Sequence, residues 1–136
     1  MAFADSQANG VILYGEGEAQ IVLAGTVKLG DALGYSGGWV RALATASAVI
    51  QMRCVAGEDG VSGQTIVAYF GKTLLGGSRF SGATDRGALY VAEAALSGQY
   101  TQTAPSTATD ATTIVGVAVG ATQGLLTPNF NVDSVA

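Results

Sequence analysis

Apolar and polar positions alternate along this chain with the period of a β-strand, in short segments separated by glycine-rich turns. The longest such region, residues 85–120, predicts strand, turn, strand, polar loop and strand in that order. Near its end, Thr113, Val115, Val117 and Val119 are expected on one face of a strand, while the positions between them are mostly small. A strand with one bulky and one nearly bare face suits the wall of a barrel or sandwich against which another backbone lies closely.

The segment that follows the first ten residues predicts two strands. Residues 11–14 and 19–23 are β-prone runs joined by a tight, acidic turn that contains two glycines. Alternation within the second run places Ala19, Ile21 and Leu23 toward the interior of the protein.

Residues 25–43 predict a hairpin, because strand-like residues stand on both sides of a serine-glycine-glycine turn at 36–38. This hairpin brings Tyr35 near Trp39. The two rings either form a cross-strand contact or point outward to a partner, and the sequence leaves both arrangements open.

Residues 42–55 carry two competing patterns. Alternation of Ile50, Met52 and Cys54 with polar neighbours favours a strand over residues 49–55. A helix over residues 41–52 is the alternative, because apolar residues also recur there at helical spacing.

The following segment, residues 65–70, is apolar on both faces and predicts a strand covered on both sides, by a sheet partner or by a neighbouring subunit. Gly76 and Gly77 are expected to break the next run. A short strand around Leu125 and Leu126 ends at Pro128.

These segments together predict an all-β fold, a small barrel or sandwich of about eight to ten short strands formed by residues 10–127 as one domain. Residues 1–9 and 128–136 hold too few large apolar groups to offset the entropy of ordering them. We therefore expect them as N-terminal and C-terminal arms that become ordered on a partner.

Charged residues make up only 12% of the 136 residues, against a usual fraction of about a quarter. A monomer of this size would carry about one charge per 400 Å² of surface, which predicts that other subunits or a larger assembly cover part of it. A monomeric protein rich in glycine and alanine is the alternative. The six basic residues are scattered, and this argues against a nucleic-acid partner.

Candidate chemistry is sparse, because the chain has no histidine and one cysteine. Residues 34–38 match the G-x-S-x-G pattern of serine hydrolases, but the base of a Ser-His-Asp triad is missing. The usual zinc and copper ligands are also missing, and the two acidic turns, at 16–18 and 58–59, lack calcium-loop spacing. We expect no catalytic activity, no metal and no cofactor.

Cys54 is expected inside, as an inert thiol. No apolar run is long enough to span a membrane, and the first residues do not form a secretory signal. Because a single cysteine cannot form an intrachain disulfide, synthesis in a reducing cytoplasm is expected.

Two pairs of segments carry a resemblance to a known family. GTVKLGDALGYSGGWVRALATAS with VIQMRCVAGEDGVSGQTIVAYFG, and GALYVAEAALSGQYTQTAP with IVGVAVGA, resemble the first and second halves of capsid decoration, or cement, proteins of tailed bacteriophages. The resemblance covers about residues 25–126. It implies a β-tulip-like barrel without enzymatic activity, assembled as a homotrimer that clamps neighbouring major capsid proteins from outside the shell, often through an N-terminal arm.

The sequence hypothesis is therefore a non-enzymatic structural protein on the outer capsid surface of a virion, made in the host cytoplasm, with no nucleic acid or membrane as partner. The alternative is a ligand-binding or carbohydrate-binding module of a virion fibre or head fibre, which needs Trp39 or a tyrosine lying flat on the surface. The residues expected to contact the partner are Ala2, Phe3, Ala4, Asp5, Trp39, Phe130 and Val132.

Overall fold

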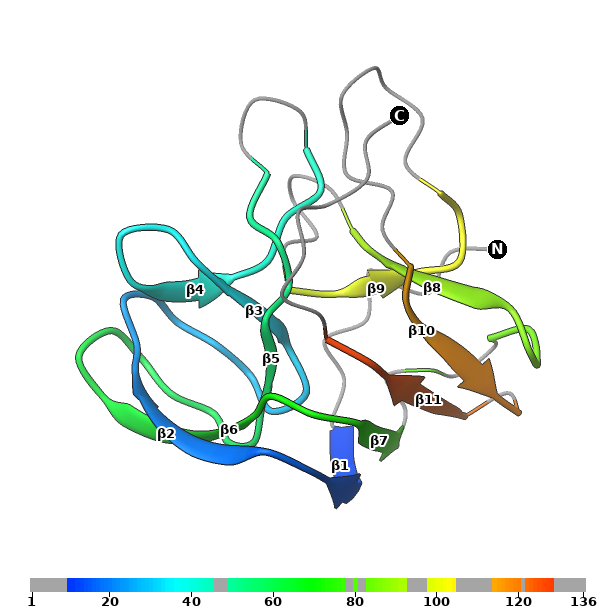
Figure 1. The fold of residues 1–136 in the computed structure, drawn as a ribbon, viewed down its shortest axis with the longest axis horizontal. Helices are drawn as coiled ribbons and strands as arrows, with labels where there is room; N and C mark the ends of the chain where they lie inside the picture. Colours follow the sequence, from blue (N-terminus) through cyan, green and yellow to red (C-terminus); the bar gives the residue numbers. More distant parts are fainter. Residues whose placement is uncertain are drawn as a thin grey trace.

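The structure, a computed structural model, describes residues 10–45, 49–77, 80, 83–92, 98–104, 114–120 and 122–128. Within these residues the chain forms eleven strands in two antiparallel sheets and no α-helix (Figure 1). The all-β prediction is confirmed, with one strand more than the upper expectation. The arm predicted at residues 1–9 lies outside the described residues, and so does the C-terminal arm apart from Pro128.

One sheet has six strands, all antiparallel to their neighbours, and lies on the right in Figure 1. Its strands in spatial order are β1 (Gly10–Gly15), β7 (Thr73–Gly77), β11 (Gln123–Leu126), β10 (Ile114–Val119), β8 (Ala88–Val91) and β9 (Tyr100–Thr101).

The other sheet has five strands and curls into a small barrel, on the left in Figure 1. Its strands in spatial order are β2 (Glu18–Val22), β6 (Thr65–Tyr69), β5 (Cys54–Ala56), β3 (Ala32–Tyr35) and β4 (Trp39–Arg41). The two edges meet where Leu23, just after β2, forms a bridge with Trp39 of β4, and the amide of Ala24 donates to the carbonyl of Trp39 at 2.9 Å. This contact closes the sheet, which we call the barrel.

The two predicted N-terminal strands form, but they belong to different sheets: β1 pairs with β7 and β2 pairs with β6. The chain passes from one sheet to the other at Gly15, Glu16 and Gly17. A side chain at Gly15 would place its Cβ 2.5 Å from the ring of Tyr69, and Gly17 has a φ of 69°. Glycine is needed at both positions, because the crossing is tight and partly left-handed. The inward placement of Ile21 and Leu23 is confirmed, and Ala19 is half-buried.

Two hydrophobic cores result from this arrangement. The barrel encloses the first, made by Ile21, Leu23, Val27, Leu33, Cys54, Ala56, Ile66 and Ala68. The second lies between the barrel wall and the six-stranded sheet, and includes Ala32, Val55, Leu75, Phe80, Leu89, Tyr100, Val115, Ala118 and Leu126. Strand β5 is buried on both faces, since Cys54 and Ala56 belong to the first core and Val55 to the second.

The strand predicted at residues 49–55 is shorter in the structure, because β5 begins only at Cys54. Ile50 forms an isolated bridge with Leu43, and the chain then crosses close to β3, where a Cβ on Gly34 would lie 2.2 Å from the carbonyl oxygen of Gln51. The burial of Cys54 is confirmed, but Met52 packs in the second core and Cys54 in the first, so the two do not share one strand face. The described residues of 41–52 form no helix.

The sequence predicted that Gly76 and Gly77 would break their strand. In the structure they instead form the end of β7, opposite Val11 and Gly10. The prediction failed because the side chain of Leu13 on the adjacent strand occupies the space that a side chain at position 76 would fill. A Cβ on Gly76 would lie 2.9 Å from Cδ1 of Leu13, so the leucine of the adjacent strand already fills that space.

Candidate interaction surface

The six-stranded sheet turns one face toward the barrel and the other face away from it. Antiparallel register aligns Tyr14, Leu74, Leu125, Val117 and Ala88 across five neighbouring strands. Residues directly opposite each other in antiparallel strands project to the same side of the sheet. Because Leu75, Leu126 and Leu89, their neighbours in sequence, are buried in the core, this apolar row lies on the side away from the barrel.

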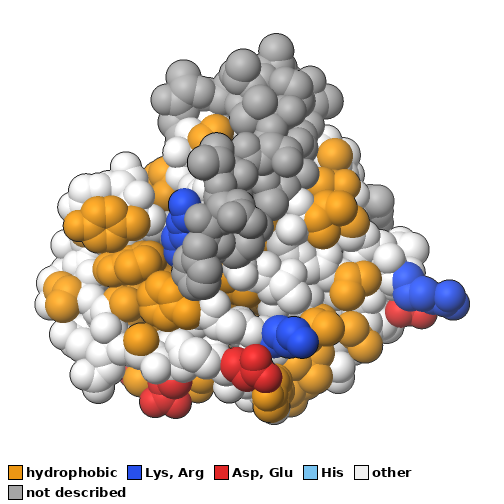
Figure 2. All heavy atoms as spheres, viewed as in Figure 1, with side chains coloured by type: hydrophobic (Ala, Val, Ile, Leu, Met, Phe, Trp, Pro, Cys, Tyr) orange, Lys and Arg blue, Asp and Glu red, His pale blue; other side chains and the backbone are white. Residues whose placement is uncertain are grey.

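The side away from the barrel keeps large apolar side chains in contact with water. We call it the outer face, and its exposed large residues are Val11, Leu13, Tyr14, Ile114, Val117 and Val119. Their exposed fractions lie between 36% and 55%. Leu74 and Leu125 are half-buried between them. Figure 2 shows hydrophobic side chains over β10 and beside β1.

Two strand irregularities enlarge the outer face. Register shifts between Ile12 and Tyr14, so that Leu13 and Tyr14 both lie opposite the stretch of β7 around Leu74. A second shift between Ile114 and Gly116 pairs Ile114 with Tyr90 of β8. Each irregularity adds one large apolar side chain that simple alternation would not place there.

The second shift also corrects the face predicted for β10. Val115 was expected beside Val117 and Val119, but it is buried, whereas those two valines are exposed. Gly116 and Ala118 are buried, so the nearly bare face is the one that packs inward. The physical reason is the irregular pairing at Ile114, which interrupts the strict alternation of sides.

The six strands of this sheet carry no charged residue. Among the described residues, charges stand just beyond the strand ends: Glu16 and Lys72 beside β1 and β7, and the Asp85–Arg86 pair before β8. The hydroxyl of Tyr14 donates to the carboxylate of Glu16, and this hydrogen bond is the main reason that the pKa of Tyr14 is raised. The outer face is therefore apolar, with both signs of charge at its margins.

Of the residues that the sequence nominated for partner binding, the structure describes only Trp39. Its ring meets Tyr35 edge to face at 5.4 Å and Phe70 at 5.4 Å, and it packs against the barrel core. The predicted proximity of Tyr35 and Trp39 is confirmed. Tyr35 is exposed while Trp39 is half-buried, so the tryptophan contributes to packing. The other nominated residues lie outside the described part of the chain: Ala2, Phe3, Ala4, Asp5, Phe130 and Val132.

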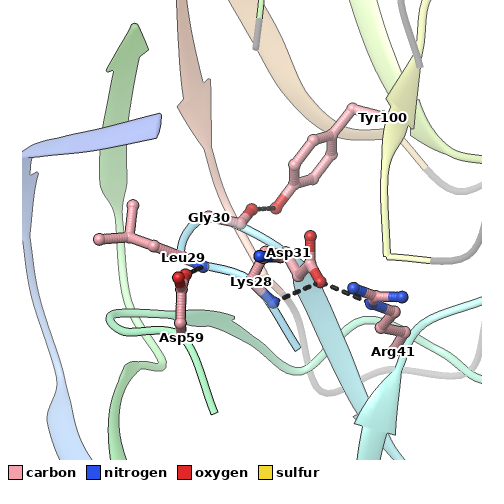
Figure 3. A network of polar contacts seen from close by, with 7 residues as sticks. All are labelled: Lys28, Leu29, Gly30, Asp31, Arg41, Asp59 and Tyr100. Atoms are coloured by element: carbon pink, nitrogen blue, oxygen red, sulfur yellow. Dashed lines mark hydrogen bonds and ion pairs between the residues drawn. The ribbon is translucent and has the colours of Figure 1, made fainter. Parts of the chain in front are cut away.

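A network of charged and polar contacts lies at the junction between the barrel and the six-stranded sheet (Figure 3). Asp31 is fully buried, and its Oδ2 accepts from the amide of Lys28 at 2.9 Å and from Nε of Arg41 at 2.7 Å. The hydroxyl of Tyr100 donates to the carbonyl of Gly30 at 2.8 Å. These bonds hold one loop between the two sheets, which is a structural role.

The remaining polar candidates also bind backbone. Asp59 accepts from the amide of Leu29 at 2.7 Å, and Glu58 accepts from the amide of Val67 at 2.8 Å. No group of three metal-ligating side chains occurs in the described ranges. Residues 34–38 form the β3–β4 hairpin, where Ser36 lies in the turn and Gly37 has a φ of 68°, instead of a strand-to-helix elbow.

Cys54 is fully buried in the barrel, and burial raises the pKa of its thiol to about 12. The thiol therefore stays protonated at neutral pH, as expected for an inert core residue. The part of the chain that the structure describes contains no helix long and apolar enough to cross a membrane.

Comparison with protein-family models, with curated proteins and with solved structures found no match. Among the features described above, the exposed apolar outer face is the main candidate for function. The sequence analysis did not predict this surface. One signal was present: the residues of the six strands include no charge, which is unusual for strands with a water-facing side.

Proposed function

We propose that this chain is a non-enzymatic structural protein that stabilises a viral capsid from outside by bridging its subunits, as its resemblance to bacteriophage decoration proteins implies. It acts as an oligomer, expected to be a homotrimer, and its partner is the major capsid protein. The observation that carries this proposal is the uncharged, apolar outer face. The largest apolar patch that a soluble protein exposes to water is often an interaction site, and apolar surfaces of this kind are common at contacts within assemblies.

The polar groups support the same proposal. Asp31, Glu58 and Asp59 hold backbone amides in place, and Cys54 is enclosed in the barrel core. A reaction centre needs titratable groups directed at a substrate, in a concave site. The described polar side chains instead fix loops between strands, which suits a rigid building block.

The alternative, a carbohydrate-binding module, is supported by one observation: Tyr35 is 64% exposed at the tip of the β3–β4 hairpin. Sugars stack on exposed aromatic faces, so Tyr35→Ala would abolish glycan-array binding if this alternative holds. The carbohydrate-binding alternative would be excluded if neither wild type nor Tyr35→Ala binds a glycan, or if the two bind equally well.

Electron microscopy tests the capsid proposal directly. Particles of the virus that encodes the chain are purified and labelled with gold-conjugated antibody raised against the chain. We expect label on the outer surface of the shell, and particles stripped of the chain should release their genome at a lower temperature. Unlabelled particles with unchanged heat stability would contradict the proposal.

A further inference from the structure

The outer face is large enough to form a specific contact. Its six exposed side chains present an apolar area on the order of 500 Å², the size of the largest patch that soluble monomers show. Two such faces in contact remove on the order of 1,000 Å² from water, which is the lower bound for a stable, specific interface. A contact between two identical outer faces therefore buries enough surface for a specific interface, without a contribution from any other part of the protein.

The shape and charge of this face also suit a copy of itself. Sheet faces pack on sheet faces about 10 Å apart, with side chains of the two layers interdigitating. Leu13 and Tyr14 on β1 and Ile114 on β10 are about half exposed, while Leu74 and Leu125 on the strands between them are half-buried. A flat apolar sheet with this pattern is complementary to a second sheet of the same kind.

The net charge of the chain favours this contact over the rest of the surface. Each copy carries a net charge of -4, so two copies repel wherever acidic surfaces meet. The strands of the outer face carry no charge, and the charges described at its margins come as Glu16 with Lys72 and Asp85 with Arg86. Approach through this face therefore avoids like-charge contact.

From these observations we infer that the outer face is a self-association surface, occupied by the outer face of a second copy of this chain. A contact between identical faces is two-fold symmetric, so it pairs copies, and the contacts that form a homotrimer lie elsewhere on the surface. The inference rests on the proposed function, because it names the partner of that same surface. It leaves the barrel side and the Tyr35–Trp39 hairpin free to meet other components of the assembly. The contact is apolar, so it weakens little when salt is added.

Analytical ultracentrifugation of the full chain from about 1 to about 100 μM tests this inference. Val117→Glu places a carboxylate in the contact, and Val22→Glu places the same group on the barrel, where Val22 is a 58% exposed valine on β2. Wild type and Val22→Glu should sediment as a multiple of the 13.6 kDa chain. Val117→Glu should raise the dissociation constant by about 100-fold or more, because it buries a charge from each copy.

Circular dichroism establishes that each variant is folded, and Val119→Lys replaces Val117→Glu if the latter does not unfold cooperatively. Wild type that stays monomeric at about 100 μM would overturn the inference, and so would a folded outer-face variant with the mass of wild type. A monomeric wild type would also remove the free oligomer from the proposed function, but these samples contain no capsid, so attachment to the shell is decided separately by electron microscopy. In the electron microscopy experiment, virus particles that carry no label for the chain would overturn the capsid proposal and leave the self-association inference unaffected.

Discussion

The barrel and the six-stranded sheet solve the same problem in different ways. Both have an apolar face that must leave water. The barrel closes on itself at Leu23 and Trp39 and encloses its own core. Its exposed positions on β2 and β6 mix the polar residues Glu18, Gln20 and Thr65 with the apolar Val22. The six-stranded sheet covers only its inner face and leaves the outer one apolar.

This difference separates stability from association. Burial inside the barrel exists in every folded copy, so it contributes to the free energy of unfolding of the monomer. The exposed part of the outer-face side chains adds to stability only when something covers it. Substitutions in the two regions should therefore change different measurements, and the predictions below test that separation.

The largest effect on stability is expected from the barrel core. Leu33→Ala removes a fully buried side chain and should lower the free energy of unfolding by about 2 to 5 kcal/mol. The mass of the folded fraction should not change, because the barrel interior does not meet the outer face. Urea denaturation checks the first expectation and sedimentation the second. If Leu33→Ala dissociated the oligomer without lowering the free energy of unfolding, the barrel core would contribute to association and not to stability, contrary to this separation.

The barrel should also lose stability at alkaline pH through Cys54. Its pKa rises from 9.0 to about 12 on folding, so the folded state keeps the thiol proton that the unfolded state releases. Stability therefore falls between about pH 9 and pH 12, by at most about 1.4 kcal/mol per pH unit. Below pH 9 this group contributes no pH dependence.

The check on this prediction is the pH dependence of unfolding for wild type minus that of Cys54→Ala, which cancels the other titrating groups. A zero difference across this range would show that the thiol is not enclosed. Cys54→Ser should be less stable than Cys54→Ala, because it buries a hydroxyl. A thiol reagent should react slowly with the native protein.

Features that depend on residues close in sequence were predicted, and features that depend on residues far apart in sequence were not. The β3–β4 hairpin was predicted because the turn at 36–38 and the flanking residues are local signals. The assignment of β1 and β2 to different sheets was not, because it depends on contacts with β7 and β6, more than forty residues away. Closure of the barrel also depends on a contact outside the local segment, between Leu23 and Trp39.

The candidate surface escaped prediction for a related reason. Alternation assigns Val115 and Val117 to one face, but the irregular pairing at Ile114 reverses this within the strand. Tyr14 joins the outer face through a similar irregularity in β1, since alternation from Val11 would direct it inward. Such shifts depend on the partner strand, which a single sequence does not reveal. The arms nominated from the sequence stay predictions, since they lie outside the described residues.

A smaller effect is expected at the junction of the two regions. Tyr100→Phe removes the hydroxyl that donates to Gly30, and should cost about 1 kcal/mol of unfolding free energy. Tyr90→Phe is the matched control, because Tyr90 lies on the neighbouring strand and is only half-buried. Equal stability of the two variants would show that the loop at Gly30 does not join the regions energetically.

The smallest effect on stability is expected on the outer face itself. Val119→Thr keeps the shape and β-branching of the side chain and should change the unfolding free energy of the monomer by less than about 0.5 kcal/mol. Its self-association should still weaken, because a hydroxyl enters an apolar contact. Thermal unfolding at low concentration and sedimentation at high concentration check the two parts. A strongly destabilised monomer would place Val119 in the core.

The separation of roles is tested most directly by labelling side chains with hydroxyl radicals at about 1 and about 100 μM protein, followed by mass spectrometry. Labelling of Tyr14 and Val117 should fall as concentration rises, because a second copy covers them. Labelling of Tyr35 and Val22, exposed to similar or greater extents on the barrel, should stay constant. Unchanged labelling of the outer face, or a fall on the barrel instead, would contradict the account.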